Sequence, residues 1–565
     1  MKKILPTLVI CILIGVLGTI FFRTYVVKYS YSAERADLDA YYEVADENDY
    51  PVILQDQFSD YHVRKIGESY YLDLSTLREL INDRFYYSEE DMTLNYCLPD
   101  TRITAKEGSD VRTDSSGKET KENYVICVQN GEIVYVALDF AKEFSNFSYQ
   151  AYTEPNRVSL YTEWGTRQEA EVTRDTSLRT LGGVKSKVVA DVAAGSKVVV
   201  LERLDNWSRV ETEDALIGYI ENRKMTEPAE AQMTPVTDYT EPEYKNITVD
   251  GKVNLVWHNI AGTAGNATLA DRIDKTKSVN AVGPTWFTVL NESGTVDGRA
   301  AQEYVDSVHE RGMQVWAVLD NFNGPNGVQQ SFLEKDESRT AVIDYVTGIA
   351  KDMGIDGINV DIEGITEDHG EDYIEFIREL SIVCRREGFI LSVDNYVPYN
   401  FNDYYRLDEQ GLFADYVVIM GYDEHYAGSS EAGSVASLDY VTYGIDEALK
   451  FVPKEKLVNA IPFYSRIWRT SSDGLTSEAY GMNEIQQFIA NHNMDVEWNG
   501  MAGQNYAESS DDEATYQIWV EDADSVEKKL EVMEARSIAG VAEWCLGMET
   551  EDVWDVISQY VKNGK

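Results

Sequence analysis

The stretch that decides the fold is Gly354-Ile-Asp-Gly-Ile-Asn-Val-Asp-Ile-Glu-Gly364, in which apolar and polar residues alternate over positions 358–363. A period of two is typical of a β-strand, because successive side chains of a strand point to opposite faces. One face then carries Asn359, Asp361 and Glu363 in a row. A buried carboxylate beside another is costly unless the two share a proton or have partners. The pattern therefore favours a functional acid pair, although a strand end with solvated acids stays open.

This strand is one of eight candidates that alternate with helical patterns over residues 244–565. The candidates are residues 253–260, 279–289, 314–321, 357–364, 390–397, 416–422, 457–464 and 538–546. Residues 338–351 show the spacing of an amphipathic helix between two of them. Alternating strands and helices predict an α/β fold, and eight such units predict a (β/α)8 TIM barrel with its active site at the C-terminal ends of the strands. Residues 469–520 are predicted to be an insertion that walls one side of a cleft.

Length and composition restrict the class of protein. The chain has 565 residues, too many for one core, and its formal net charge is -48. Such a surface repels nucleic acid and anionic lipid, so we expect no nucleic-acid partner. The six His and five Cys show no metal-ligand spacing, so the sequence predicts no metal and no cofactor. The sequence leaves open whether Cys97 and Cys127 pair.

The N-terminus, residues 1–29, is predicted to be a cytoplasmic tip followed by a transmembrane signal anchor. Lys2 and Lys3 precede an apolar run over residues 4–22, which can cross a bilayer core at about 1.5 Å per residue. No cleavage motif of small residues follows it, so we expect an uncleaved anchor with the body of the protein outside the cytoplasm. The charge bias across the run is weak. Cleavage that releases a secreted protein therefore stays an alternative.

Four further regions are expected between the anchor and the barrel. Residues 30–49 are acidic and predict a stalk. Residues 50–165 predict a small α+β domain whose two halves each have strand, turn, strand and short helix, with a loop over residues 106–123. Residues 166–225 predict a small all-β domain. Residues 226–243 contain three prolines among polar residues and predict a linker.

The two small domains resemble known modules. Residues 50–165 resemble the domain first named from the N-terminus of copper amine oxidases, although no His cluster is present and no copper chemistry is implied. Residues 166–225 resemble a bacterial SH3-like domain through the run Asn206-Trp207-Ser-Arg-Val. These resemblances imply attachment to a bacterial cell wall or a role as rigid spacers.

The central motif and three others resemble one enzyme family. Asp356-Gly-Ile-Asn359-Val-Asp361-Ile-Glu363 is similar to the DxxDxDxE signature of family 18 glycoside hydrolases, which include the chitinases. Further matches are Met420-Gly-Tyr422-Asp423 on strand six, Ile461-Pro-Phe-Tyr464-Ser-Arg466 on strand seven and Trp544 on strand eight. Residues 284–287, 315–316 and 519–522 are similar to the spore-germination and cell-wall branch of this family. The resemblance covers residues 244–561.

The resemblance implies substrate-assisted hydrolysis next to an N-acetylated sugar. Glu363 would protonate the glycosidic oxygen, and Asp361 would hold the acetamido N–H of the sugar. The acetamido oxygen of the substrate would attack carbon one, which is a known exception to the two-carboxylate mechanism. Tyr422 would hydrogen-bond that oxygen, Asp423 would position the sugar, and Trp544 would lie under its ring. The other substrate-binding residues implied are Asn359, Met420, Tyr464 and Arg466.

The sequence departs from the family signature at Asn359, where the chitinases have Asp. An amide cannot take up a proton as that Asp can, so the usual movement of Asp361 between two acids is in question. Because the wall-lytic branch commonly carries Asn at this position, Asn359 does not by itself indicate an inactive enzyme. The structural alternatives are that Trp544 and Tyr422 belong to the core, that Asp423 caps a helix, that Asp356 closes a turn and that Arg466 pairs with an inner acid.

Three functions compete at this stage. The first is a membrane-anchored hydrolase that cuts β-1,4 bonds at N-acetylglucosamine in peptidoglycan or a chitin-like glycan, with the bacterial cell wall as its partner. The second is a non-catalytic glycan-binding protein on the same barrel. The third is an assembly factor of the envelope or spore. The presence of Glu363 favours the first.

Overall fold

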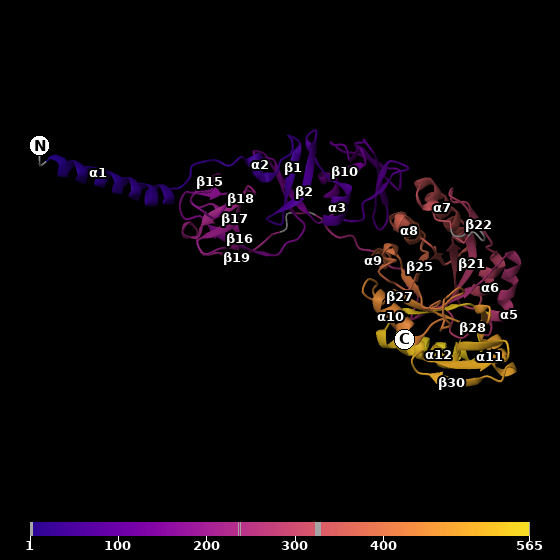
Figure 1. Cartoon of the computed structure of the whole chain (residues 1–565). Helices are drawn as coiled ribbons and strands as arrows, with labels where there is room; N and C mark the ends of the chain where they lie inside the picture. The colour runs from indigo at the N-terminus through magenta and orange to yellow at the C-terminus, as the bar shows by residue number, and fades with distance from the viewer. Residues whose placement is uncertain (1–3, 235–236, 238, 323–328, 564–565) are drawn as a thin grey trace. The chain divides into compact units, whose positions relative to one another are not determined.

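The computed structural model describes residues 4–234, 237, 239–322 and 329–563, and the chain forms two units (Figure 1). Unit 1 comprises Met1–Phe85, Ala105–Arg112 and Glu119–Glu241. Unit 2 comprises Tyr86–Thr104, Thr113–Lys118 and Pro242–Lys565. The predicted domain boundaries are finer than this division and stay predictions.

The chain begins with the apolar helix α1 (Ile4–Phe21), which continues as a π-helical segment over Phe22–Val27. The stretch Leu8–Val27 has a mean hydropathy of 2.1 and is long and apolar enough to cross a membrane by length and composition. This agrees with the predicted length of the apolar run.

Unit 1 contains a first seven-stranded sheet in the order β11-β12-β1-β2-β3-β10-β9. Its strands are β1 (Asp49–Leu54), β2 (Gln57–Ile66), β3 (Ser69–Asp73), β9 (Cys127–Asn130), β10 (Ile133–Ala137), β11 (Ser148–Tyr152) and β12 (Arg157–Tyr161). The short helices α3 (Leu74–Leu80) and α4 (Leu138–Ala141) follow β3 and β10 directly. The predicted repeat of two strands and a short helix is therefore present twice.

Five further short strands follow α3. They are β4 (Tyr86–Ser88), β5 (Thr93–Cys97), β6 (Arg102–Lys106), β7 (Val111–Asp114) and β8 (Glu119–Lys121). The last two fall within residues 106–123, which the sequence predicted to be a loop. The polar composition there belongs to a tight turn, in which Oδ1 of Asp114 accepts hydrogen bonds from the backbone of Ser116 and Lys118.

A second seven-stranded sheet of unit 1 has the order β15-β14-β18-β17-β16-β13-β19. Its strands are β13 (Thr166–Glu171), β14 (Thr176–Arg179), β15 (Val188–Val192), β16 (Lys197–Arg203), β17 (Trp207–Thr212), β18 (Ile217–Glu221) and β19 (Ala229–Gln232). The predicted all-β character holds. Strand β19 lies in the predicted linker and pairs with β13 at the edge of the sheet. The resemblance of both small domains to known modules stays a prediction.

The acidic segment predicted as a stalk contains a short helix, α2 (Leu38–Tyr42). Asp37 caps it by accepting a hydrogen bond from the backbone of Ala40. The ring of Tyr42 is buried, and its hydroxyl accepts a hydrogen bond of 2.8 Å from the backbone N–H of Ile217. Because Leu38 and Tyr42 present apolar surface, this part of the segment packs on the second sheet instead of standing free.

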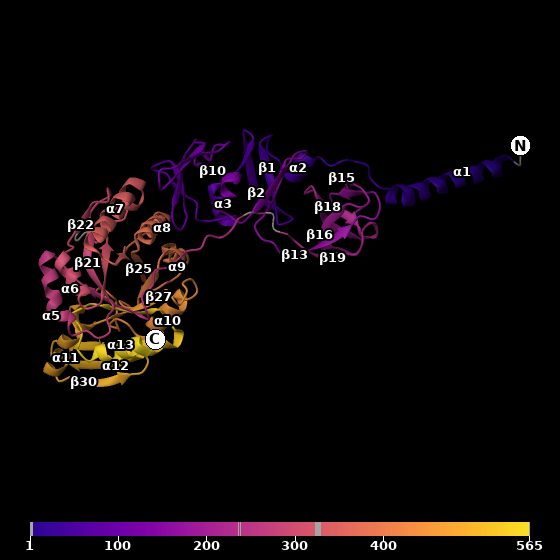
Figure 2. The same ribbon diagram turned by 180° about the vertical axis from the view of Figure 1, so that it is seen from behind.

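Unit 2 contains a closed barrel of eight parallel strands, so the predicted TIM barrel is confirmed (Figures 1 and 2). The strands are β20 (Val253–His258), β21 (Ala281–Val289), β23 (Gln314–Asp320), β24 (Gly357–Asp361), β25 (Ile390–Tyr396), β26 (Tyr416–Met420), β27 (Leu457–Pro462) and β33 (Gly540–Trp544). Pairing of β20 with both β33 and β21 closes the ring. A short strand, β22 (Val296–Gly298), pairs antiparallel with β21.

Helices cover the outside of the barrel. They are α5 (Leu269–Ile273), α6 (Gln302–His309), α7 (Asp336–Met353), α8 (Gly370–Glu387), α9 (Leu407–Phe413), α10 (Leu438–Ala448), α12 (Ala523–Arg536) and α13 (Val553–Asn563). One apolar cluster fills the layer between strands and helices, and a second cluster fills the barrel interior. Large rings close that interior, since Trp316 stacks on Tyr416 with ring centroids 5.5 Å apart.

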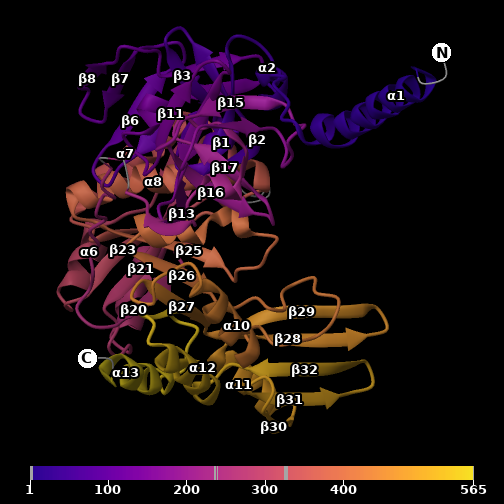
Figure 3. The same cartoon turned by 90° about the vertical axis from the view of Figure 1, so that its left-hand side faces the viewer.

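The insertion between the seventh and eighth barrel strands forms a five-stranded antiparallel sheet, seen as long arrows in Figure 3. Its elements are β28 (Tyr464–Ser471), β29 (Gly474–Gly481), α11 (Met482–Asn491), β30 (Asp495–Asn499), β31 (Gln504–Ser510) and β32 (Ala514–Val520). It begins at Tyr464, five residues earlier than predicted. The reason is that β27 ends at Pro462, and the following residues pair with β29 and β32.

Candidate active site

The two acids of the central motif lie at the C-terminal end of β24. Asp361 is the last residue of the strand, and Glu363 follows two residues later. Asn321, just after β23, holds the backbone at Glu363 from both sides. Its Oδ1 accepts a 2.9 Å hydrogen bond from the N–H of Glu363, and its Nδ2 donates a 2.8 Å bond to the carbonyl oxygen of Glu363. The position of Glu363 is therefore fixed by a neighbouring strand.

Both carboxyl groups bind their protons more tightly than exposed acids do. Burial raises the pKa of Asp361 well above its usual range, and the charges of Glu363, Asp394 and Asp320 raise it further. Burial is also the main reason why the pKa of Glu363 is raised. Oδ1 of Asp361 is buried and has no hydrogen-bond partner among the described residues. Since like charges at short distance cannot both ionise easily, the pair keeps a proton at pH values at which an exposed carboxyl has lost it.

Tyr396, the last residue of β25, contacts the predicted acid directly. Its hydroxyl donates a 2.5 Å hydrogen bond to Oε2 of Glu363. This bond favours the ionised form of Glu363 and opposes the effect of burial on the pKa of Glu363. Asp320, at the end of β23, acts in the other direction. Burial raises the pKa of Asp320 to about 6, and its charge contributes to the raised pKa of Glu363.

The Asn359 side chain is buried and fully hydrogen-bonded inside the barrel. Its Oδ1 accepts a 2.8 Å bond from Nε1 of Trp257. Its Nδ2 donates to Oγ of Ser392 at 2.9 Å and to Oδ1 of Asp394 at 2.8 Å, both on β25. An amide with donors on one side and acceptors on the other has one stable orientation.

Tyr422 and Asp423 follow β26 on the same rim of the barrel. Burial raises the pKa of Tyr422 well above its usual value, and the charges of Asp361, Asp394 and Glu363 raise it further. Its ring packs against the apolar cluster of the barrel interior. Asp423 has a φ of 58°, in the left-handed region. Its Oδ1 accepts a 2.6 Å hydrogen bond from the hydroxyl of Tyr464, so Asp423 is held by the insertion and caps no helix.

The remaining predicted residues come from two barrel strands and the insertion. Met420 ends β26 and is buried. Trp544 ends β33, is half-buried, and lies 6.0 Å from Trp257 between ring centroids. Arg466 lies on β28, where its NH1 donates to Oγ of Ser477 at 3.3 Å. Met420 and Trp544 therefore come from two barrel strands that end on the same rim, and Arg466 comes from the insertion that follows β27.

Sequence reasoning missed Asp394, Tyr396 and Asn321, which complete this arrangement. The signal was present in the run Leu391-Ser-Val-Asp-Asn-Tyr396, where polar residues alternate on a strand predicted to be buried. The structural alternative for Asp356, a role in the turn before its strand, agrees with its hydrogen bond. Its Oδ2 accepts a 2.8 Å hydrogen bond from the backbone N–H of Val315 at the opposite end of β24, away from the acids.

Comparison with known proteins agrees with this geometry. Residues 305–549 match the family model of the glycosyl hydrolases family 18. The C-terminal domain of this chain is a family 18 domain. The match spans the motif on β24, the residues after β26 and Trp544, and it contains six of the eight barrel strands, from β23 to β33.

Relatives of the family 18 domain include two proteins of Bacillus subtilis. The uncharacterized glycosylase YvbX is 24% identical over 325 residues, which covers 55% of this chain and 94% of that protein. A cortical fragment-lytic enzyme is 22% identical over 259 residues, which covers 44% of this chain and 59% of that protein. The crystal structure of the C-terminal domain of a presumed chitinase from Desulfitobacterium hafniense superposes with a TM-score of 0.50 at 18% identity, covering 55% of this chain and 100% of that domain. This last likeness shows the fold alone.

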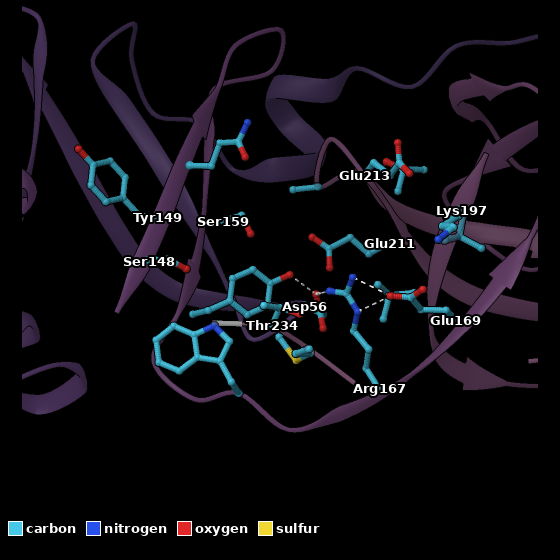
Figure 4. A pocket seen from close by; sticks show the side chains of 18 of the residues that line it. Asp56, Ser148, Tyr149, Ser159, Arg167, Glu169, Lys197, Glu211, Glu213 and Thr234 are labelled. Atoms are coloured by element: carbon cyan, nitrogen blue, oxygen red, sulfur yellow. Dashed lines mark hydrogen bonds and ion pairs between the residues drawn. The ribbon is translucent and has the colours of Figure 1, made fainter. Parts of the chain in front are cut away.

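A separate cavity of about 510 Å³ lies in unit 1 and is lined by both of its seven-stranded sheets (Figure 4). Glu211 lies at its centre in the figure, near Asp56, Arg167 and Glu169. Burial raises the pKa of Glu211 to about 9, and Asp56 raises it further through a hydrogen bond and its charge.

Within the described residues, no group of three or more His, Cys, Asp or Glu could hold a metal ion, and all five cysteines are free.

Proposed function

We propose that this protein is a membrane-anchored glycoside hydrolase that acts outside the cytoplasm. Its family 18 domain would cleave β-1,4 bonds at N-acetylglucosamine in peptidoglycan or a chitin-like glycan, with retention of configuration. The observation that carries the proposal is the pair of carboxyl groups of Asp361 and Glu363, both with pKa values raised mainly by burial, at the end of a barrel strand. Such a pair can deliver a proton at neutral pH.

The first step of the proposed reaction breaks the glycosidic bond. Glu363 gives its proton to the glycosidic oxygen, which leaves with the bonding electrons. The acetamido oxygen of the sugar forms a new bond to carbon one and yields an oxazolinium ion. Asp361 accepts a hydrogen bond from the acetamido N–H and stabilises the positive charge that develops on the ring. Tyr422 donates a hydrogen bond to the acetamido oxygen, since its raised pKa keeps its hydroxyl protonated.

The second step uses water. Ionised Glu363 takes a proton from a water molecule, the water oxygen bonds to carbon one, and the bond from carbon one to the acetamido oxygen breaks. Two displacements at one carbon restore the original configuration. Tyr396 supports Glu363 in this state, because its hydrogen bond is strongest to the carboxylate.

Two observations support a wall glycan as the substrate. The relatives include a protein named for cortical fragment lysis. Trp544 ends β33 and Tyr422 follows β26, on the rim that carries the acid pair, and both rings offer surfaces on which a sugar ring can stack.

The test compares wild-type protein with Glu363→Gln on purified peptidoglycan and on oligomers of N-acetylglucosamine. Mass spectrometry should find new reducing ends with wild type and none with Glu363→Gln, while a sedimentation assay should find that both bind the glycan. Glu367→Gln removes an exposed acid nearby and is the matched control, with wild-type turnover. Equal turnover by Glu363→Gln would remove the proposed mechanism. Binding without turnover by the wild type would favour a glycan-binding or assembly protein.

The proposed location has its own test. α1 and the following π-helical segment have the length and composition of a span, and cleavage would release a secreted protein instead. A reporter fused after Lys565 should fractionate with membranes and stay sensitive to protease added outside the cell. Recovery of a shortened chain from the medium would contradict an uncleaved anchor.

A further inference from the structure

Asp394 is a buried acid that takes part in neither step of the proposed reaction. It lies on β25, is 3% exposed, and its Oδ1 accepts a hydrogen bond from Asn359. In the described part of the chain it forms no ion pair with any Lys, Arg or His. A carboxyl group in this position is costly unless it shares a proton with neighbours.

The register of the sheet places Asp394 beside the acid pair. Val360 on β24 pairs with Val393 on β25, so the next residues of the two parallel strands are Asp361 and Asp394. Side chains two residues apart on a strand share a face, and Asn359 and Asp361 therefore point to the same side as Ser392 and Asp394. The direct hydrogen bond from Asn359 to Asp394 confirms that shared face.

The other titratable groups around Asp394 come from three parts of the barrel. These are Asp361 and Glu363 from β24 and its end, Tyr422 after β26 and Tyr373 from α8. All of them are acids or phenols. Three carboxyl groups without a cation cannot all ionise in a buried cluster, so at least one proton is shared among them at neutral pH.

We propose that Asp394 is a positioning residue that forms a proton-sharing set with Asp361 and Glu363. It supplies from β25 the inner carboxyl group that Asn359 cannot supply from β24, and it fixes the Asn359 amide by accepting its hydrogen bond. The set keeps a proton available to Glu363. This inference rests on the proposed hydrolase function and assigns a role to a residue outside the motif on β24.

The test is the pH dependence of kcat/KM for Asp394→Asn, which removes the charge and keeps the shape. A negative neighbour raises the pKa of an acid, so its removal lowers that pKa and the general acid loses its proton earlier as pH rises. The alkaline limb should move to lower pH by about one unit. An unchanged limb would overturn the proposal.

Two further variants separate charge from structure. Ser392→Ala removes the other acceptor of Asn359 Nδ2 without removing a charge, so its alkaline limb should stay at the wild-type position. The double variant Asn359→Asp with Asp394→Asn moves the acid from β25 to β24. It should return the alkaline limb of kcat/KM to its wild-type pH. A shift with Ser392→Ala equal to that with Asp394→Asn, or no restoration in the double variant, would show a merely structural role.

A readout without catalysis keeps this inference separate from the proposed function. Infrared difference spectra of wild-type protein with labelled aspartate should contain a protonated carboxyl band at neutral pH, and that band should titrate at lower pH in Asp394→Asn. Absence of the band from the wild type overturns the proton-sharing set, even if no variant folds. One outcome is that the wild type cleaves no glycan while it shows the band and the band titrates at lower pH in Asp394→Asn. In that case the hydrolase proposal fails and the proton-sharing set is supported.

Discussion

The hydroxyl of Tyr396 at the end of β25 donates a 2.5 Å hydrogen bond to Oε2 of Glu363, which follows the adjacent strand β24. The same strand carries Asp394 two residues earlier, so β25 presents two groups with opposite effects on the acid pair. The tyrosine favours the ionised form of Glu363, and the aspartate favours the protonated form of the pair.

Tyr396→Phe should move the alkaline limb of kcat/KM to higher pH by roughly half a unit to one unit, because Glu363 loses a donor to its ionised form. The rate at the optimum should fall roughly tenfold, since the carboxylate left after proton transfer is less stable. The measurement is a pH series with an oligosaccharide substrate. Tyr443→Phe, on the exposed side of α10, is the control. A limb that moves to lower pH would contradict the assigned direction.

Tyr422→Phe should lower kcat/KM by about 10²–10³-fold, the usual effect of removing one hydrogen-bond donor to a transition state. Because the hydroxyl would act on the acetamido oxygen, most of the loss should lie in kcat. A substrate in which the acetamido group is replaced by a free amine should be turned over poorly by wild type and variant alike. If Tyr422→Phe lowers kcat/KM by a similar factor on every substrate, and only through KM, then Tyr422 has a binding role only.

Glu211→Gln should stabilise unit 1, and the gain should grow as pH rises. The folded-state pKa of Glu211 is raised to about 9 from 4.5, mainly by burial, so the unfolded chain releases the proton first. Stability from this group is fully present below the unfolded pKa and is lost progressively between pH 4.5 and about 9. The neutral amide removes this loss. We expect a gain on the order of 1–3 kcal/mol at neutral pH and none near pH 4.

Thermal unfolding of the full chain at several pH values checks the Glu211 prediction. Glu213→Gln is the matched control, because Glu213 lines the same cavity and is exposed. It should leave the pH dependence unchanged. A gain for Glu211→Gln that is independent of pH would indicate better packing in place of a titration effect.

Lys529→Met should destabilise the barrel by about 3–5 kcal/mol, because it leaves a buried carboxylate without its cation. Nζ of Lys529 on α12 lies 2.9 Å from both carboxyl oxygens of Glu521, and both side chains are fully buried. Glu521 also accepts from Gln504 at 2.6 Å and so ties the insertion to α12. Denaturant unfolding measures the loss. The double variant with Glu521→Leu should recover part of it, and an additive loss would contradict the ion-pair explanation.

The alternation of residues along single strands was enough to predict the eight barrel strands. Local spacing determines which face a side chain takes, and eight strands with helices between them have few ways to close. The acid pair could be predicted for the same reason, since Asp361 and Glu363 are two positions apart on one strand. Strand ends were less certain, as at β27, because pairing with the insertion decided where the barrel strand stops.

The sequence by itself therefore determined the barrel, the apolar helix α1 and the two acids of the motif. Only the tertiary structure decided that Asp394, Tyr396 and Asn321 join those acids and that Tyr464 holds Asp423. These partners lie 33 to 42 residues from the side chains they contact, as for the pairs Glu363–Tyr396, Asn359–Asp394, Glu363–Asn321 and Asp423–Tyr464. Their meeting depends on strand register and barrel closure, which bring distant residues to one rim, and no pattern within a single strand contains that information.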